Sequence, residues 1–127
     1  GFGKISQTSL EAYAKLWGAI ESTLEIIKPG INCSDIYSSL SKYVLPENKN
    51  HGSVGRMGHG IGLQLTEPPS IMQTDKTIIE KNMIITLEPS IELHKNLMLV
   101  QEENILITED GYKLLSTRTP EKLPIIN

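Results

Sequence analysis

One imidazole lies among glycines in the segment Gly58-His59-Gly60-Ile61-Gly62. Glycine has no Cβ and lets a backbone approach a ligand closely. Imidazole titrates near neutral pH and is also a common metal ligand. A glycine-rich surface turn that carries a solvated histidine would have the same composition. This segment alone therefore leaves open whether His59 performs chemistry.

Two glutamates fall where strands are predicted. Glu88 ends the apolar run 83–87, and Glu102 shares a period-two face with Val100 and Leu106. An ionised carboxylate on an apolar face is costly, so we expect a cation, a metal or strong hydrogen-bond donors beside Glu102. The alternatives are an acid left in water at a strand end, or an ion pair with a lysine.

Together, one histidine and two carboxylates on separate segments form a donor set of nitrogen and oxygen atoms. Such a set suits Zn, Mn, Fe or Co, and the chain has too few soft ligands for copper or an iron–sulfur cluster. We therefore interpret His59, Glu88 and Glu102 as parts of one metal site.

Two amphipathic helices are predicted before these residues. The segment Thr8-Ser9-Leu10-Glu11 has the form of a capping box, and apolar residues then recur at helical spacing up to Ile27. The first helix should end at Lys28-Pro29-Gly30. A second helix should begin in the capping cluster Asn32 to Asp35 and end at Pro46.

The pattern changes to that of strands after the polar segment Glu47 to Gly52. The strand candidates are residues 83–87, 97–108 and 112–115, with Asp110-Gly111 in a tight hairpin turn between the last two. The predicted fold class is α+β, with two helices packed on a mainly antiparallel sheet. Apolar residues on both alternating sets near 105–107 predict that both sheet faces are covered, one by the helices and the other from outside this chain.

Bulk properties narrow the function classes. The chain has 127 residues and a formal net charge of −3, with lysines and arginines scattered along it. A nucleic-acid binder would show a basic cluster, so we expect no such partner. No apolar run approaches the roughly 20 residues that cross a bilayer, so we expect no membrane span. The single Cys33 excludes an internal disulfide and favours a cytoplasmic location.

Three stretches carry a family resemblance: Gly58 to Pro69, Thr86-Leu87-Glu88-Pro89, and Gln101 to Gly111. In residue types, order and spacing they resemble motifs of the creatinase, methionine aminopeptidase and prolidase superfamily. The helix end at Ile27-Lys28-Pro29-Gly30 is similar too, so the resemblance covers nearly the whole chain. The nearest branch contains Xaa-Pro dipeptidases and ectoine hydrolase-like proteins. The resemblance implies that residues 1–127 are the C-terminal half of a pita-bread catalytic domain.

The resemblance also implies roles for residues. In that family two divalent ions (Mn, Co, Zn or Fe) are held by two aspartates from the first half, then one histidine and two glutamates. Carried over by motif, the last three are His59, Glu88 and Glu102. Glu88 would also be the general base for the attacking water, Glu102 would bridge both ions, and Thr66 and Glu67 would face the substrate.

Two of the five implied ligands lie outside this chain, because the family's aspartates precede the first long helix. Asp35 and Asp75 sit in a helix cap and in a turn-rich loop, which makes them poor substitutes. We therefore expect the chain by itself to bind metal weakly or not at all and to hydrolyse no amide. Apolar surface left by an absent first half predicts self-association, with a dimer as the simplest form.

Thr66 departs from the family pattern, which usually has a second histidine at this position. A hydroxyl donates one hydrogen bond but does not titrate near neutrality. The expected substrate is a small peptide or another small amide. Three functions stay open: an Xaa-Pro dipeptidase or aminopeptidase, an ectoine hydrolase-type amide hydrolase that need not use metal, and a non-catalytic protein that binds peptides or other proteins.

Overall fold

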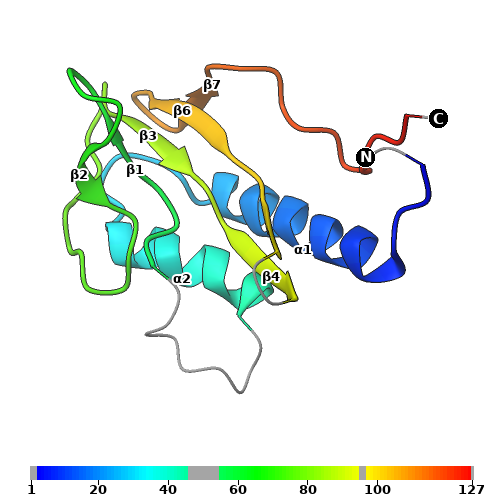
Figure 1. Cartoon of the computed structure of the whole chain (residues 1–127). Coiled ribbons are helices and arrows are strands. Elements are labelled where there is room, and N and C mark those ends of the chain that lie inside the picture. The colour runs from blue at the N-terminus through cyan, green and yellow to red at the C-terminus, as the bar shows by residue number, and fades with distance from the viewer. Residues whose placement is uncertain (1–2, 46–54, 95–96, 127) are drawn as a thin grey trace.

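The computed structural model of the chain describes residues 3–45, 55–94 and 97–126. Two helices lie together on one side of an antiparallel sheet (Figure 1), which confirms the predicted fold class. The described elements, in chain order, are α1 Gln7–Leu24, α2 Cys33–Val44, β1 His59–Ile61, β2 Glu67–Ser70, β3 Ile84–Leu87, β4 Ser90–His94, β5 Leu97–Val100, β6 Glu103–Ile107 and β7 Tyr112–Leu114. The polar segment Glu47 to Gly52 and Pro46 lie outside the described residues.

Helix α1 begins earlier than the capping box predicts. Its N-cap is Ser6, whose hydroxyl accepts a hydrogen bond from the Ser9 amide at 3.1 Å. The prediction that Thr8 caps the helix is wrong, because Ser6 already satisfies one of the free amides of the first turn. The regular helix ends at Leu24, and the chain then turns through Gly30, which has a φ of 94°.

Helix α2 follows the prediction closely. Its N-cap is Asn32, and the Asn32 side chain donates to Asp35 at 3.0 Å instead of capping a backbone amide. The helix ends at Val44, two residues before Pro46. Its apolar stripe packs against α1 and the sheet, through the buried residues Cys33, Ile36, Tyr37, Leu40 and Val44.

The described strands form one five-stranded sheet in the order β2-β1-β3-β6-β7 and a two-stranded ribbon, β4-β5. All pairings are antiparallel. The predicted strand 97–108 is therefore two strands, β5 and β6, separated by Gln101 and Glu102. The predicted hairpin between residues 97–108 and 112–115 is confirmed as the pairing of β6 with β7.

Sequence patterns missed three strands. β1 lies in the glycine-rich segment, β2 contains Pro68 and Pro69, and β4 follows Pro89 directly. Gly and Pro are depleted in strands, so the local signal argued against strands in these places. Pairing with neighbours that lie far away in the sequence overrides that signal: β1 is held between β2 and β3.

The two faces of the sheet differ in burial. Ile85, Leu87, Ile105 and Ile107 have no exposed surface, and they join the helices in one core. Leu106, on the opposite face, is only half-buried. The prediction of a cover from the helices on one face is thus confirmed, and within the described residues the other face stays partly open.

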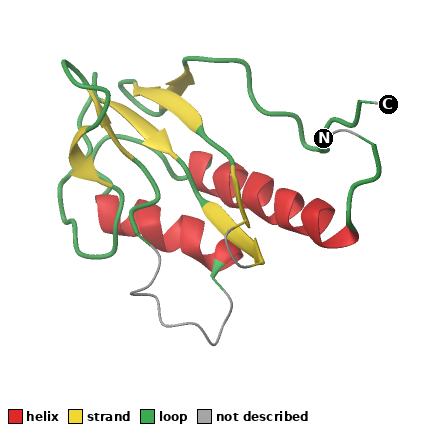
Figure 2. Ribbon diagram, in the orientation of Figure 1, coloured by secondary structure: helices red, strands yellow, loops and turns green. Residues whose placement is uncertain are grey.

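The C-terminal segment returns past α1 to the start of the chain (Figure 2). The amide of Gly3 donates to the carbonyl oxygen of Ile126 at 3.2 Å, so the two ends of the described chain meet. Within the described residues, neither helix is long and apolar enough to cross a membrane.

Candidate active site

His59 is held by the strand on each side of it. Its amide donates to the Thr86 hydroxyl at 3.0 Å, and its ring is buried. Gly58, just before it, passes so close to β3 that an added Cβ would lie 2.0 Å from the carbonyl oxygen of Thr86. The glycines around His59 therefore serve close strand packing, and the solvated-turn interpretation of this segment is wrong.

The orientation of the His59 ring is defined by one contact. Nδ1 lies 2.9 Å from the carbonyl oxygen of Gly60. A carbonyl oxygen can only accept a hydrogen bond, so Nδ1 donates its proton to it, and in the neutral imidazole Nε2 then carries the free electron pair. A metal-ligating histidine commonly has this arrangement, with its second nitrogen bound to a carbonyl.

Glu88 faces that free nitrogen. Its Oε1 atom lies 3.6 Å from Nε2 of His59, and about a quarter of the Glu88 side chain is exposed. Two electron-pair donors at this separation repel one another unless a cation or a proton lies between them. The guanidinium of Arg56 also approaches, with Nε 4.0 Å from the same carboxylate oxygen. Sequence reasoning missed Arg56, because nothing in its spacing linked it to Glu88.

Glu102 lies opposite Glu88 on the neighbouring strand. The pairs Leu87–Glu103 and Ser90–Val100 have the same register, so Glu88 and Glu102 face one another between them. The amide of Gln101 donates to the carbonyl oxygen of Pro89 at 3.3 Å, which supports that register. Residues directly opposite in an antiparallel pair project to the same face of the sheet.

The expectation of a buried Glu102 is wrong. Glu102 is exposed, whereas its neighbour Glu103 is 1% exposed and pairs with Arg118. Period-two alternation places adjacent residues on opposite faces, but it does not tell which face the helices cover. Among the described residues, no group of three or more His, Cys, Asp or Glu side chains converges as a metal site would require. The structure brings His59 and Glu88 together and leaves Glu102 in solvent.

Thr66 lies at the end of the connection between β1 and β2, and Glu67 is the first residue of β2. Thr66 is exposed, and Glu67 folds back into its own loop, where Oε2 accepts a hydrogen bond from the Gln64 amide at 3.2 Å. The Glu67 carboxylate occupies the space beside Gly62, because an added Cβ there would lie 1.9 Å from Oε1. Their predicted contact with substrate stays a prediction.

The two aspartates that were judged poor ligands have structural roles. Asp35 accepts from Asn32, and Asp75 accepts the amides of Ser70 at 2.9 Å and Thr77 at 2.8 Å. Hydrogen bonds from Thr77, and then from Ser70, hold the pKa of Asp75 below its ordinary value. Both carboxylates therefore stabilise local turns.

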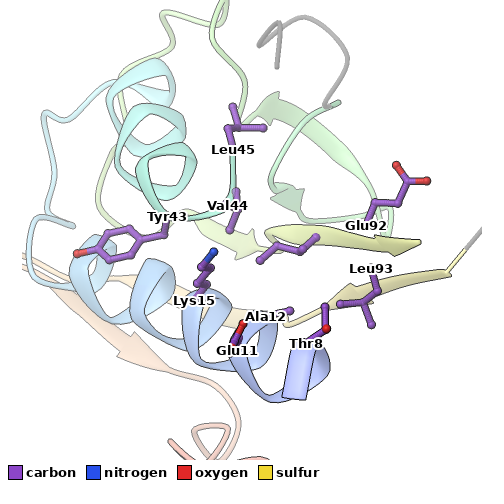
Figure 3. A pocket seen from close by; sticks show the side chains of 10 residues that line it. Thr8, Glu11, Ala12, Lys15, Tyr43, Val44, Leu45, Glu92 and Leu93 are labelled. Atoms are coloured by element: carbon purple, nitrogen blue, oxygen red, sulfur yellow. The ribbon is translucent and has the colours of Figure 1, made fainter. Parts of the chain in front are cut away.

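A hollow of about 200 Å³ lies between the start of α1, the end of α2 and strand β4 (Figure 3). It is lined by Ala12, Val44 and Ile91, and by the exposed residues Lys15 and Glu92. His59, Glu88 and Glu102 do not line it. This hollow is therefore separate from the candidate site.

Comparison with known proteins decides the family. The model of metallopeptidase family M24 matches residues 1–109, which is most of the chain. The chain belongs to metallopeptidase family M24. The resemblance to prolidases and aminopeptidases is thereby confirmed. His59, Glu88 and Glu102 all fall within the residues that the M24 model matches.

Curated relatives of this M24 chain are about three times as long as it is. It is 35% identical to an uncharacterized peptidase of Staphylococcus aureus over 117 residues, which cover 91% of this chain and 33% of the relative. It is 31% identical to an Xaa-Pro dipeptidase of Pyrococcus furiosus over 121 residues, which cover 95% and 34%. The chain thus spans about a third of the length of these M24 relatives.

The M24 chain also covers about a third of two solved structures, a prolidase and an X-Pro aminopeptidase. A prolidase from Pyrococcus furiosus superposes with a TM-score of 0.82 at 30% identity, covering 93% of this chain and 35% of that one. An X-Pro aminopeptidase from Thermotoga maritima superposes with a TM-score of 0.84 at 26% identity, covering 99% and 36%. A methionine aminopeptidase from Rickettsia prowazekii, at 21% identity and a TM-score of 0.69, shares the fold.

Proposed function

We propose that the chain contributes His59, Glu88 and Glu102 to the active site of a metal-dependent hydrolase that cleaves an amide bond, as an Xaa-Pro dipeptidase or aminopeptidase does. The observation that carries the proposal is the approach of Nε2 of His59 to Oε1 of Glu88 at 3.6 Å. Membership of family M24 and the likeness to an Xaa-Pro dipeptidase support the reaction class.

The residues fit a divalent cation. Nδ1 of His59 is committed to the Gly60 carbonyl, so Nε2 and the Glu88 carboxylate offer one nitrogen and one oxygen ligand to the same space. Glu102 lies opposite Glu88 and adds a second carboxylate on a side chain that is free to turn toward it. Nitrogen and oxygen ligands of this kind suit Zn, Mn, Fe or Co.

When bound, divalent metal would lower the pKa of a water and polarise the amide carbonyl. Glu88 would then act as general base and take the proton of the attacking water on its carboxylate. Thr66, which is exposed, would donate its hydroxyl proton in a hydrogen bond to the substrate. Arg56 would help to orient the Glu88 carboxylate through its contact at 4.0 Å.

We further propose that the chain by itself holds metal weakly. One imidazole and two carboxylates neutralise a single dication at most, and a two-metal site needs more negative charge than that. The described structure agrees with an incomplete site, since only His59 and Glu88 approach one another. Two further carboxylates from outside these residues would complete the ligand set.

A second candidate function is hydrolysis of a small non-peptide amide, of the ectoine hydrolase type. Two features of the β1–β2 connection favour it. Thr66 stands where an aminopeptidase would have a titratable imidazole, and Glu67 is bound to its own loop instead of being turned outward. This site therefore offers fewer charged contacts to a peptide.

Metal titration tests the proposal. Mn, Co and Zn would be titrated by calorimetry into residues 1–127 and into the full-length gene product, with His59→Ala as the test variant. His94→Ala, an exposed histidine at the end of β4, is the matched control. We expect stoichiometric metal in the full-length product, weak binding in residues 1–127, and loss of binding in His59→Ala only.

Activity assays separate the alternatives. Xaa-Pro dipeptides, N-terminal Met peptides and ectoine would be offered with and without a chelator. Hydrolysis that survives chelation would overturn the metal site, and a full-length product with no metal and no activity would indicate a non-catalytic binding protein. Metal-dependent activity of residues 1–127 that vanishes in His59→Ala would show that three ligands suffice.

A further inference from the structure

The two residues that flank Glu102 are both buried. Gln101 is 5% exposed and Glu103 is 1% exposed, whereas Glu102 between them is exposed. Successive side chains in an extended strand project to opposite faces. Burial of Gln101 and Glu103 against the helix side therefore directs Glu102 to the open face, where Glu88 and His59 lie.

The buried carboxylate of Glu103 is held by the C-terminal segment. Its Oε1 atom accepts Nη1 of Arg118 at 2.8 Å and the amide of Thr119 at 3.0 Å. An ionised carboxylate with so little exposure needs a cation, and Arg118 supplies it. Among the described residues, Arg118 is the only cation that pairs with Glu103.

Arg118 is in turn fixed on α1. Its guanidinium lies 5.2 Å from the centre of the Trp17 ring, and Nη2 approaches the Trp17 carbonyl oxygen at 3.4 Å and Glu21 at 3.5 Å. The Trp17 indole also donates to the carbonyl oxygen of Thr119 at 3.1 Å. The C-terminal segment is thus attached to α1 immediately beside Glu103.

Gln101 is tied to the same helix. Its Nε2 atom donates to the carbonyl oxygen of Tyr13 at 3.2 Å, and the Tyr13 hydroxyl donates to the carbonyl oxygen of Pro120. The strand around Glu102 is therefore anchored to α1 at the residue before it and at the residue after it. Of the two anchors, only the one through Glu103 depends on a pair of opposite charges.

We propose that Arg118, acting through Glu103, is a positioning residue that holds Glu102 on the open face of the sheet opposite Glu88. Without the guanidinium, Glu103 would be left as an unpaired buried carboxylate and would turn toward water. Because strand faces alternate, that movement would carry Glu102 away from the open face. Arg118 lies beyond residues 1–109, so the match to the family model does not assign it a role.

The expected effect of Arg118 on metal binding rests on the proposed function, in which Glu102 is a metal ligand. Residues that orient a metal ligand typically change metal affinity by about 10–100-fold when they are removed. The orientation of Glu102 and its use as a ligand can be tested apart, because only the second needs metal.

The first experiment measures orientation without metal. Amide hydrogen exchange would be followed by NMR across residues 1–127 in Arg118→Met, Arg118→Lys and the control Lys122→Met, which removes an exposed charge from the same segment. We expect exchange at residues 101–104 to rise about tenfold or more in Arg118→Met, with α2 unchanged. Arg118→Lys should restore part of the protection at residues 101–104. Lys122→Met should exchange as slowly there as the wild type.

A double variant distinguishes a local change around Glu102 from unfolding of the whole molecule. Glu103→Gln combined with Arg118→Met removes both charges and keeps similar shapes, so no unpaired charge stays buried. We expect it to be closer to the wild type in protection of residues 101–104 than Arg118→Met alone. Protection that falls equally across the whole molecule in Arg118→Met, or a double variant no better than it, would overturn the inference.

The second experiment adds Mn²⁺ to the full-length gene product and follows paramagnetic broadening near His59 in a double-mutant cycle with Glu102→Gln. We expect Arg118→Met to weaken Mn²⁺ binding about tenfold or more in the wild-type background and much less in Glu102→Gln. Equal weakening in both backgrounds would overturn the positioning role. If the wild type shows no broadening near His59, the proposed function fails, and the exchange experiment still decides the orientation of Glu102.

Discussion

The two faces of the central sheet differ in the burial of their side chains and in the partners of their charged groups. On the helix face, Ile85, Leu87, Ile105 and Ile107 are fully buried, and Glu103 has its own cation. On the open face, Nε2 of His59 lies 3.6 Å from Oε1 of Glu88. Among the described residues, apolar packing is thus extensive on the helix face, whereas the open face carries polar groups of the kind that ligate metals.

We therefore expect the helix face to contribute mainly to stability and the open face mainly to function. Side chains on the helix face gain free energy from burial and packing, so substitutions there should unfold the protein. Side chains on the open face gain little from their own chain, so substitutions there should change binding and association.

The largest expected effect is the loss of a core side chain. Leu87→Ala should lower the free energy of unfolding by about 2–5 kcal/mol, because it removes buried methyl groups and leaves a cavity. Val100→Ala, on the exposed side of the ribbon, should stay within about 0.5 kcal/mol of the wild type. Urea unfolding followed by circular dichroism measures both, and similar losses would contradict the contrast.

Self-association should depend on exposed apolar side chains. Leu63 and Leu65 in the β1–β2 connection are almost fully exposed, and Met98 and Val100 are more than half exposed. Such side chains favour contact with a second copy, so the sedimentation coefficient should rise with concentration.

The double variant Leu63→Ser/Leu65→Ser should shift that rise to higher concentration. Ser22→Ala, at the polar contact with Tyr43 between the helices, serves as the control. A chain that stays monomeric at all concentrations would show that these leucines do not drive association.

Acid should weaken the turn around Asp75. Its pKa is lower in the folded state than in the unfolded chain, so its stabilising effect is complete above the ordinary pKa of about 4 and is lost as pH falls through the folded value. Asp75→Asn should therefore flatten the decline of stability below pH 4 relative to the wild type. Thermal unfolding from pH 7 to pH 2 measures this, with the exposed Asp110→Asn as control.

The smallest effect is expected at Cys33, which is buried at the start of α2. Burial, helped by the negative charge of Asp75, raises the pKa of its thiol to about 11. Because the thiolate is the reactive form, iodoacetamide at pH 8 should label the folded chain very slowly. Rapid labelling without denaturant would show that this end of the core opens readily, and full labelling in guanidinium confirms that the thiol is intact.

Much of the architecture could be predicted from the sequence because its signals are local. Apolar residues at helical spacing identified both helices, and Asp110-Gly111 identified the β6–β7 hairpin. The motifs around His59, Glu88 and Glu102 were enough to indicate the family, since each motif is a short run of particular residue types. Each of these features lies within one short stretch of consecutive residues, the longest being the 18 residues of α1.

Tertiary structure alone decided how distant residues meet. β1 forms in spite of its glycines because it pairs with β3, and β2 forms in spite of its prolines because it pairs with β1. Alternation showed that Glu102 and Glu103 lie on opposite faces, but only the position of α1 decided that Glu103 is the buried one. Its partner, Arg118, is 15 residues away in the chain and is held on Trp17 of α1. No local pattern encodes such a contact, because its free energy comes from burying three segments together.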